Sequence, residues 1–302
     1  MTSEASAKAI GVGYIGLGTM GEPMARNVVA AGFPTWVHDL NDLAVGRLVN
    51  AGARAAGSPR ELARNCRVVL VNVVNDAQVE QVVCAPDTGL MDALDEGSVV
   101  VVHSTVHPDT CVRLAGELAK RGVGLIDAPF TGGASAAAAG TLSLLVGGEH
   151  WCVEAARPVL EAEGVVTHLG GVGTGEVAKL GNNLVIGITV HAVHEAIRLG
   201  MSAGLDSDTM LAVLTSGAAD CWAARNWDSV GGMAAVYPGG AEGLAALTRK
   251  DLGLAMQVAK DHDLQLRITE QAATDLHECY LGALRHVSAK RDVPGAEGSD
   301  SE

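Results

Sequence analysis

The first 172 residues alternate short apolar runs with amphipathic stretches of helical period. The apolar runs, rich in Val, Leu and Ile, are AIGVGYIGL, TWVHD, RVVLVNVV, SVVVVHS, GVGLIDAPF, TLSLLVGG and VVTHLGG. Near-continuous runs of this kind are typical of strands buried on both faces of a parallel sheet. The stretches between them, such as TMGEPMARNVVAAG, supply the helices of a βαβ rhythm. The pattern predicts an α/β domain with a doubly wound, mostly parallel sheet.

The pattern changes at about Gly173, where the strand-like runs stop. The segment GEVAKLGNNLVIGITVHAVHEAIRLGMSAG then reads at helical period. Because no Pro-rich or Ser-rich linker separates the two parts, we expect one long helix to leave the sheet domain directly. The sequence therefore predicts a sheet domain over residues 1–172 and an all-helical domain over residues 173–287. Residues 288–302 are small, polar and acidic, and we expect them to form a disordered tail.

Length, charge and cysteine spacing exclude several classes of protein. The 302 residues exceed what one core usually serves, which agrees with two domains. The 21 basic and 35 acidic residues give a net charge of −14 without a basic cluster, so nucleic acid and membrane lipid are not expected partners. No secretory leader and no apolar run approaching the roughly 18 residues of a membrane span are recognised. The six scattered cysteines form no metal-binding pair, so we expect no metal and a cytoplasmic location.

A glycine-rich motif follows the first predicted strand and opens the first predicted helix. It consists of Gly16, Leu17, Gly18, Thr19, Met20 and Gly21. In this context Gly16 allows a tight turn, Gly18 lets backbone N–H groups approach a pyrophosphate, and Gly21 lets the helix pack closely on the strand. The helix N-terminus favours the anion. The motif predicts dinucleotide binding, and the alternative is a bare turn between strand and helix.

An acidic residue ends the second predicted strand. Asp39 lies 18 residues beyond Gly21, near the spacing at which a carboxylate accepts hydrogen bonds from the adenosine ribose. A 2′-phosphate would meet this carboxylate, and no Arg follows in HDLND to receive one. We therefore expect NAD rather than NADP. The alternative role, a helix N-cap, falls more naturally to Asn41 or Asp42.

Three segments, in order along the chain, resemble a known family. They are GYIGLGTMGEPMARNVVAAG, DAPFTGGASAAAAGTLSLLVGG and GTGEVAKLGNN. They are similar to the signature segments of the β-hydroxyacid dehydrogenases, which include 3-hydroxyisobutyrate dehydrogenases, tartronate semialdehyde reductases and 6-phosphogluconate dehydrogenase-like enzymes. The resemblance runs from about Ile10 to Asp261. It implies a Rossmann-type domain, an interdomain helix, a helical C-terminal domain and a homodimer or homotetramer.

Lys179 and Asn183 are the expected catalytic residues. They are four residues apart on a predicted helix, so both side chains lie on one helix face. A lysine ammonium can protonate a carbonyl oxygen during reduction, and the neutral amine can take a hydroxyl proton during oxidation. Spacing alone would equally suit a solvated lysine beside an asparagine that bonds its own helix. The resemblance matches Lys179 to the family's catalytic lysine and Asn183 to its partner.

Two further segments are expected to bind substrate. Thr131, Gly132 and Gly133 end a strand and could hold a carboxylate with backbone N–H groups and a hydroxyl, although an ordinary turn would look the same. Ser104 and Thr105 follow SVVVV, where the alternative is a helix N-cap. The resemblance implies substrate contacts for all five residues and a cofactor contact for Thr105.

The remaining expected cofactor contacts lie in two segments. Val73, Val74 and Asn75 follow the apolar run RVVLV and are expected beside the cofactor. Lys250 and Asp251 match a Lys-Asp pair that closes over the cofactor in the resembled family. The alternative for this pair is a helix-surface ion pair.

Departures from the family pattern bear on the substrate. Phe130 stands where relatives usually carry a small aliphatic residue, and Val102-His103 stands where they often carry an acid. We expect Phe130 either to point toward the substrate's distal carbons or to brace the backbone before Thr131. His191 and His194 lie too far along the predicted helix from Lys179 to share its substrate, so we expect a structural or oligomer contact there.

The sequence favours an NAD-dependent oxidoreductase that transfers hydride between nicotinamide and a small β-hydroxy acid or aldehyde acid. Two alternatives are a cofactor-binding regulatory protein without turnover and an imine reductase-like enzyme on the same fold. Lys179, Asn183 and the hydroxyl-bearing segments argue for turnover, since a binding protein needs only the glycine loop and Asp39. Retention of Lys179 argues against an imine reductase, whose members usually replace that lysine.

Overall fold

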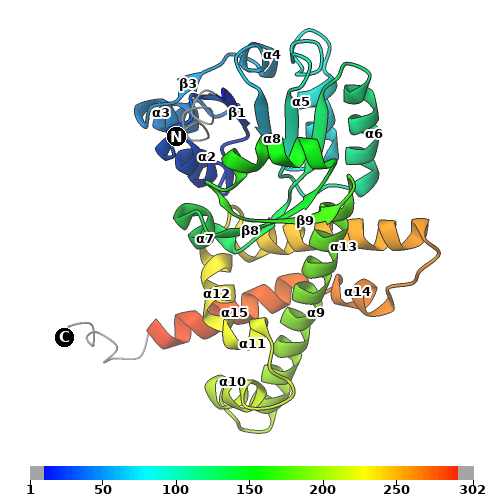
Figure 1. Cartoon of the computed structure of the whole chain (residues 1–302). Coiled ribbons are helices and arrows are strands. Elements are labelled where there is room, and N and C mark those ends of the chain that lie inside the picture. Colours follow the sequence, from blue (N-terminus) through cyan, green and yellow to red (C-terminus); the bar gives the residue numbers. More distant parts are fainter. Residues whose placement is uncertain (1–9, 292–302) are drawn as a thin grey trace. The chain divides into compact units, whose positions relative to one another are not determined.

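The computed structural model describes residues 10–291, which form two compact units (Figure 1). Unit 1 ends at Lys179 and unit 2 begins at Leu180. A 29-residue helix, α9 (Thr174–Ser202), begins in unit 1 and continues into unit 2. The division lies seven residues beyond the boundary expected from the sequence, because the first turn of α9 is bonded to the sheet of unit 1.

Unit 1 contains a nine-stranded, mostly parallel sheet, which confirms the predicted fold class. The strand order is β3-β2-β1-β4-β5-β6-β8-β7, with β9 also paired to β8. The first six strands of this order run parallel, β8 is antiparallel to β6 and β7, and β9 is parallel to β8. The strands are β1 (Val12–Ile15), β2 (Thr35–His38), β3 (Arg54–Ala55), β4 (Val68–Val71), β5 (Val99–Val102), β6 (Gly124–Asp127), β7 (Phe130–Thr131), β8 (Leu142–Gly147) and β9 (Gly164–Gly170).

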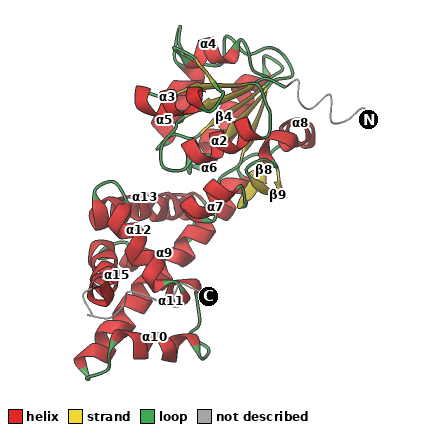
Figure 2. Cartoon of the chain, turned by 90° about the vertical axis from the view of Figure 1, so that its left-hand side faces the viewer, coloured by secondary structure: helices red, strands yellow, loops and turns green. Residues whose placement is uncertain are grey.

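Helices cover both faces of this sheet, as near-continuous apolar strands require (Figure 2). One core contains buried residues of α2, α3, α7 and α8, and the other contains buried residues of α4, α5 and α6. Every residue of β1, β4, β5 and β6 is buried. The helices are α2 (Gly21–Ala30), α3 (Asp42–Asn50), α4 (Pro59–Ala63), α5 (Asp76–Cys84), α6 (Pro108–Ala119), α7 (Gly133–Ala139) and α8 (His150–Leu160).

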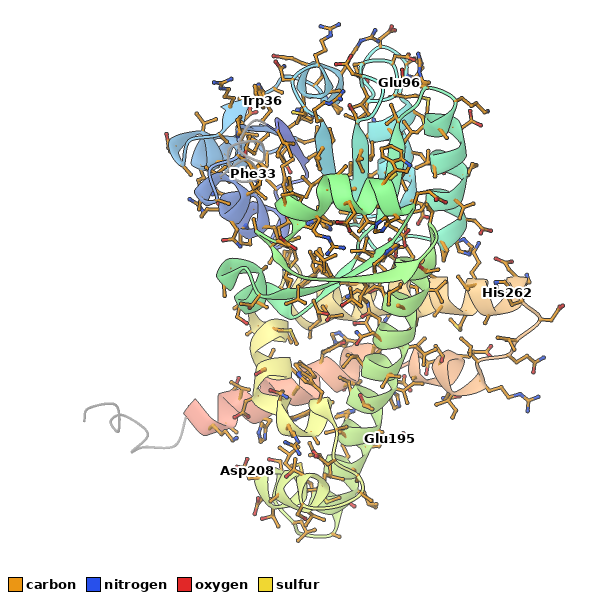
Figure 3. All side chains as sticks on the ribbon, viewed as in Figure 1. Phe33, Trp36, Glu96, Glu195, Asp208 and His262 are labelled. Atoms are coloured by element: carbon orange, nitrogen blue, oxygen red, sulfur yellow. The ribbon has the colours of Figure 1, made fainter. Side chains whose placement is uncertain are left out.

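The described part of unit 2 is helical, and its core surrounds the buried Trp227. Besides α9, its helices are α10 (Ser207–Thr215), α11 (Trp222–Arg225), α12 (Trp227–Val236), α13 (Gly240–Asp261), α14 (Arg267–Ala272) and α15 (Leu276–Arg291). The buried His286 of α15 joins three of them, because its Nδ1 lies 2.8 Å from Ser207 Oγ and its Nε2 lies 2.9 Å from Asp228 Oδ1. Lys290 contacts Asp208 of α10, which is labelled in Figure 3, at 2.9 Å.

One expectation from the sequence is corrected here. The segment from Ser288 to Arg291 is the last turn of α15 and not part of a disordered tail, since the helix also carries the Lys290 ion pairs. The rest of the expected tail, residues 292–302, lies outside the described residues.

One helix of the described residues is long and apolar enough to cross a membrane, judged by length and composition alone. Helix α9 has an 18-residue window with a mean hydropathy of 1.3, because residues 180–194 contain no Asp, Glu, Lys or Arg. Its Val190, Val193 and Ile197 nevertheless pack in the core of unit 2. Such packing is the behaviour of a core helix in a globular domain.

Helices α12 and α15 pack so closely that one position between them tolerates only glycine. A Cβ atom on Gly231 would lie 2.4 Å from the carbonyl oxygen of Ala283, whereas a Cβ on the neighbouring Gly232 would meet nothing within 4 Å. We therefore predict that Gly231→Ala lowers the free energy of unfolding by about 1–3 kcal/mol through overpacking. Gly232→Ala, the matched control, should raise it by up to about 1 kcal/mol through helix propensity.

Urea denaturation followed by circular dichroism measures both changes. Equal effects of the two substitutions would contradict the packing described for α12 and α15.

Candidate active site

The glycine-rich loop joins β1 to α2, as the motif predicts. Gly16 has a φ of 92°, and a Cβ there would lie 2.2 Å from the carbonyl oxygen of Asn72. A Cβ on Gly21 would lie 2.0 Å from the carbonyl oxygen of Gly16, so both positions need glycine for close packing within the protein. Gly18 differs, because a Cβ there would meet no protein atom within 4 Å. The loop therefore leaves open space beside Gly18, at the N-terminus of α2.

The other residues of the loop face different environments. Leu17 is buried in the core, Thr19 is exposed, and Met20 packs partly against the same core. Met20 is the N-cap of α2 and makes no side-chain capping bond. The first N–H groups of α2 are therefore not capped by that side chain, which suits an anion at this end of the helix.

Asp39 follows β2 and is bonded to the glycine-rich loop. Its Oδ2 accepts a hydrogen bond from the backbone N–H of Leu17 at 2.5 Å, and its Oδ1 accepts one from Asn41 N–H at 2.7 Å. The N-cap of α3 is Asn41, whose side chain accepts from Leu43 N–H, so Asp39 is not the cap. On the same strand Trp36, labelled in Figure 3, lies under the guanidinium of Arg54 at 4.9 Å.

Ser104 joins the ends of two neighbouring strands. Its Oγ accepts a hydrogen bond from Val73 N–H at 2.7 Å and lies 3.4 Å from the Val71 carbonyl oxygen, to which it donates. The segment after β4 is thereby fixed to the segment after β5. In the segment after β4, Val74 is exposed. Asn75 is the N-cap of α5, and its side chain accepts a hydrogen bond from Gln78 N–H at 3.0 Å. Thr105 is half-buried beside Ser104.

Thr131, Gly132 and Gly133 lie where β7 passes into α7. The φ angles of the two glycines, 130° and 73°, fall in the region that favours glycine. A Cβ on Gly132 would lie 2.7 Å from Ala136 Cβ, whereas one on Gly133 would meet nothing within 4 Å. Gly132 is therefore required by the conformation and packing of the turn. Gly133 adjoins open space, and Thr131 is half-buried beside it.

Lys179 is held against this segment. Its Nζ donates a hydrogen bond to the backbone carbonyl oxygen of Phe130 at 2.6 Å, so an ammonium lies directly before Thr131. The Phe130 ring packs partly against the core and meets the His103 ring edge-on, with 5.8 Å between centroids. This packing supports the bracing role considered for Phe130.

The position of Lys179 depends on a buried aspartate that the sequence analysis did not single out. Asp127, the last residue of β6, accepts hydrogen bonds from Gly173 N–H at 2.6 Å and from Glu176 N–H at 2.9 Å. Gly173 precedes α9 and has no side chain to cap it, so a carboxylate from the sheet takes the capping role. Burial raises the pKa of Asp127, although these two backbone N–H groups oppose the shift. The signal in the sequence was an acid at the end of a buried strand.

A second missed residue holds the same turn. Glu176 is fully buried, and its Oε2 accepts from the backbone N–H of Val106 at 3.3 Å. The first turn of α9 is thereby bonded to the segment after β5 and to the end of β6. Lys179 lies one turn further along the helix.

Unit 2 brings together three more of the residues expected at the site, Asn183, Lys250 and Asp251. Asn183 Nδ2 donates to Asp251 Oδ2 at 2.7 Å, and Lys250 Nζ lies 3.0 Å from Asp251 Oδ1. The buried Asp251 therefore orients both an amide and an ammonium. Asn182 is exposed and its Nδ2 lies 3.1 Å from Asn183 Oδ1.

The two other side chains weighed on α9 have structural contacts in unit 2. His194 is buried, and a Cβ on Gly282 would lie 2.6 Å from its ring. His191 Nδ1 lies 3.5 Å from Cys279 Sγ, and its Nε2 lies 3.5 Å from Glu195. These contacts support a structural role for both histidines.

Two family models together match nearly all the described residues. The NAD binding domain of 6-phosphogluconate dehydrogenase matches residues 11–171, and the NAD-binding domain of NADP-dependent 3-hydroxyisobutyrate dehydrogenase matches residues 173–293. A solved structure described as 3-hydroxyisobutyrate dehydrogenase from Salmonella typhimurium is 30% identical with a TM-score of 0.79, covering 92% of this chain and 99% of that one. An imine reductase from Pseudomonas sp., at 16% identity and a TM-score of 0.61, shares the fold alone.

Curated relatives give the same result. A probable mitochondrial 3-hydroxyisobutyrate dehydrogenase of Dictyostelium discoideum is 36% identical over 82% of this chain and 79% of its own length. An NAD-dependent L-serine dehydrogenase of Pseudomonas aeruginosa is 36% identical over 82% of this chain and 85% of its own length. The resemblance stated from the three sequence segments is thereby confirmed. The chain belongs to the β-hydroxyacid dehydrogenase family and is an NAD(P)-dependent oxidoreductase that acts on a CH–OH group.

Proposed function

We propose that this enzyme interconverts a small β-hydroxy acid and the matching aldehyde acid, with Lys179 as the general acid and base. The observation that carries the proposal is the 2.6 Å hydrogen bond from Lys179 Nζ to the Phe130 carbonyl oxygen. It holds an ammonium beside Thr131, at the segment whose backbone turns through Gly132 and Gly133. A proton donor and a carboxylate-binding segment then serve one small substrate.

The glycine loop fits the dinucleotide that the family binds. The open space beside Gly18 is where a pyrophosphate fits, because Gly16 and Gly21 are packed against protein atoms and Gly18 is not. The positive end of the α2 dipole is suited to its charge. Asp39 would accept from the adenosine ribose hydroxyls, and its carboxylate disfavours a 2′-phosphate. When bound, NAD accepts hydride in the oxidation and NADH supplies it in the reduction.

Lys179 handles the proton of the substrate oxygen. A carbonyl oxygen can only accept, so Lys179 is the donor in its bond to Phe130. In the reduction, the ammonium gives a proton to the substrate's carbonyl oxygen. In the oxidation, the neutral amine takes the hydroxyl proton. We assign Asn183 the role of a second substrate contact, oriented by its 2.7 Å hydrogen bond to Asp251.

The substrate carboxylate is assigned to the segment from Thr131 to Gly133. The Thr131 hydroxyl and the backbone N–H groups of the two glycines provide uncharged donors for an anion. Ser104 and Thr105 are the contacts assigned on the neighbouring strand end, where Ser104 is already fixed by Val73 N–H. Two relatives are named for 3-hydroxyisobutyrate and L-serine, both 3-hydroxypropanoates that carry a substituent on carbon 2 and a hydroxyl on the carbon β to the carboxylate. This shared frame defines the substrate class that we propose.

We also propose a homodimer or homotetramer in the cytoplasm. Support for association comes from large apolar side chains that unit 2 exposes, among them Leu199 at 71% and Val236 at 84%. Exposed apolar surface of this kind marks protein contacts in many oligomers. Light scattering of the purified protein measures the subunit number.

Replacing the lysine tests the proposed chemistry. We predict that Lys179→Met lowers kcat by about 10²–10⁴-fold, the usual contribution of general acid–base catalysis, while NADH affinity stays within about twofold. Stopped-flow or steady-state kinetics with a panel of β-hydroxy acids measures kcat, and NADH fluorescence titration measures affinity. Lys120→Met, which changes an exposed lysine paired with Glu117, is the control.

Wild-type kcat in Lys179→Met would contradict the role assigned to this residue. Loss of NADH binding would show that Lys179 supports the cofactor site instead.

A separate substitution tests the cofactor site. We predict that Gly18→Val weakens NADH binding by at least about tenfold, because the side chain would occupy the space left for the pyrophosphate. The melting temperature of the cofactor-free protein should change little, since no protein atom lies within 4 Å of the added Cβ. Gly16→Val, the contrasting variant, should lower that melting temperature because its Cβ would overlap the Asn72 carbonyl.

Calorimetric titration and thermal melting separate the two effects. Unchanged NADH affinity in Gly18→Val would show that the cofactor does not approach this loop.

A further inference from the structure

Unit 1 buries a histidine and a glutamate that the proposed reaction does not use. His103 follows β5 and is 2% exposed, while Glu163 lies between α8 and β9 and is fully buried. Their facing atoms, His103 Nε2 and Glu163 Oε2, are 3.1 Å apart. Tyr14 of β1 is also fully buried, and its ring lies near the His103 ring at 6.4 Å between centroids. The site is a polar cluster inside an otherwise apolar core.

The hydrogen bonds of His103 fix the number of protons in this pair. Its Nδ1 lies 2.6 Å from the carbonyl oxygen of Ala128, and a carbonyl can only accept, so Nδ1 carries a proton. One further proton is needed between Nε2 and the Glu163 carboxyl, because two lone pairs that face each other at 3.1 Å would repel. The pair is therefore neutral in total, with a shared proton, and is written most simply as imidazolium and carboxylate.

The pair lies among the groups that hold the proposed site. The backbone N–H of His103 donates to the Val71 carbonyl oxygen at 2.8 Å, and the next residue is Ser104. The ring bonds Ala128, two residues before Phe130, and also meets the Phe130 ring edge-on. The carbonyl of Phe130 in turn accepts from Lys179. A change in the orientation of the His103 ring would therefore displace both segments that carry the site, the one at Ser104 and the one from Ala128 to Thr131.

The surroundings of His103 raise the pKa of its ring on balance. Burial of the ring lowers its pKa, but the charge of Glu163, the hydrogen bond to it and the Ala128 carbonyl together raise that pKa above the ordinary value. The other titratable group facing the pair is Tyr14, whose pKa is raised by burial and by Glu163, so its phenol stays neutral. The pKa of His103 is higher in the folded protein than in the unfolded chain. The pair therefore contributes its full share to the free energy of unfolding below about pH 6.5, and this share is lost as the pH rises through the pKa of the folded protein.

Stability alone does not account for burying this pair. Two apolar side chains of similar volume often stabilise a core as well as a buried ion pair does, because charges lose their hydration on burial. What the pair adds is direction, since the ring is held by the Nδ1 hydrogen bond to Ala128 and by the Glu163 carboxylate 3.1 Å from Nε2.

We propose that His103 and Glu163 are positioning residues, which share a proton and hold the Ala128–Thr131 and Ser104 segments in the geometry that the reaction needs. This inference rests on the proposed function, since it assigns the pair to the site of Lys179. It makes turnover depend on a proton held inside the sheet domain, away from substrate and cofactor.

Glu163→Gln tests the proposal with little change in volume. A glutamine amide can donate to a neutral imidazole but cannot hold an imidazolium, so the shared proton is lost. We expect kcat/KM to fall about tenfold through displacement of the site, with NADH affinity within about twofold of wild type. The alkaline fall of kcat/KM that comes from loss of the shared proton should disappear. Glu161→Gln, an exposed glutamate two residues earlier, removes the same charge and should leave kinetics unchanged.

A measurement on the wild-type protein keeps the test independent of folding of the variant. Nitrogen-15 spectra of histidine-labelled protein should show both ring nitrogens of His103 still protonated at about pH 6.5, the ordinary histidine pKa, assigned through the coupling of Nδ1 to the Ala128 carbonyl. A ring that is already neutral at about pH 6.5 would overturn the proposal. So would wild-type kinetics and an unchanged pH profile in Glu163→Gln, provided that Lys179→Met is inactive. Activity in Lys179→Met would instead overturn the proposed function on which this inference rests.

Discussion

The two hydrogen bonds from the start of α9 to Asp127 are the interaction on which the rest of the site depends. They bond the N–H groups of Gly173 and Glu176 to a carboxylate at the end of β6. A helix that starts after a glycine has no side-chain cap of its own, and an unbonded N–H group in the protein interior would cost about 1–3 kcal/mol. The sheet supplies the missing acceptor. The first turn of α9 is therefore fixed to the strand ends before the helix reaches Lys179.

Acidic side chains inside unit 1 serve as acceptors for backbone and imidazole groups rather than as solvated charges. Asp127, Glu176 and Glu163 are all fully buried near the ends of β5 and β6 or beside the segments that follow them. Each has a specific partner: α9 N–H groups, Val106 N–H and His103. Buried charges are tolerated when they are bonded in this way. Together they order the loops at one edge of the sheet, where parallel α/β folds place their ligands.

The sequence predicted the repeating part of the fold well and the connections poorly. Apolar runs with the spacing of βαβ units predicted the parallel sheet, and the glycine motif predicted the loop between β1 and α2, because both depend on local periodicity and backbone conformation. The capping of α9 by Asp127 joins residues 46 and 49 positions apart, and the pairing of His103 with Glu163 joins residues 60 apart. Contacts of that range leave no pattern in a single sequence. The helical turn at Ser288–Arg291 was missed because its composition is polar, and the ion pairs of Lys290 with Asp208 and Asp228 leave no local pattern.

The central claim is that anchoring of α9 to Asp127 places the lysine for proton transfer. The most direct test compares amide hydrogen exchange of Glu176 with the single-turnover rate of NADH formation, in wild type and in Asp127→Asn. An amide that can accept only through its oxygen satisfies one of the two N–H groups, so both the exchange protection of the first turn and the single-turnover rate should fall together. Loss of protection with an unchanged single-turnover rate would contradict the account.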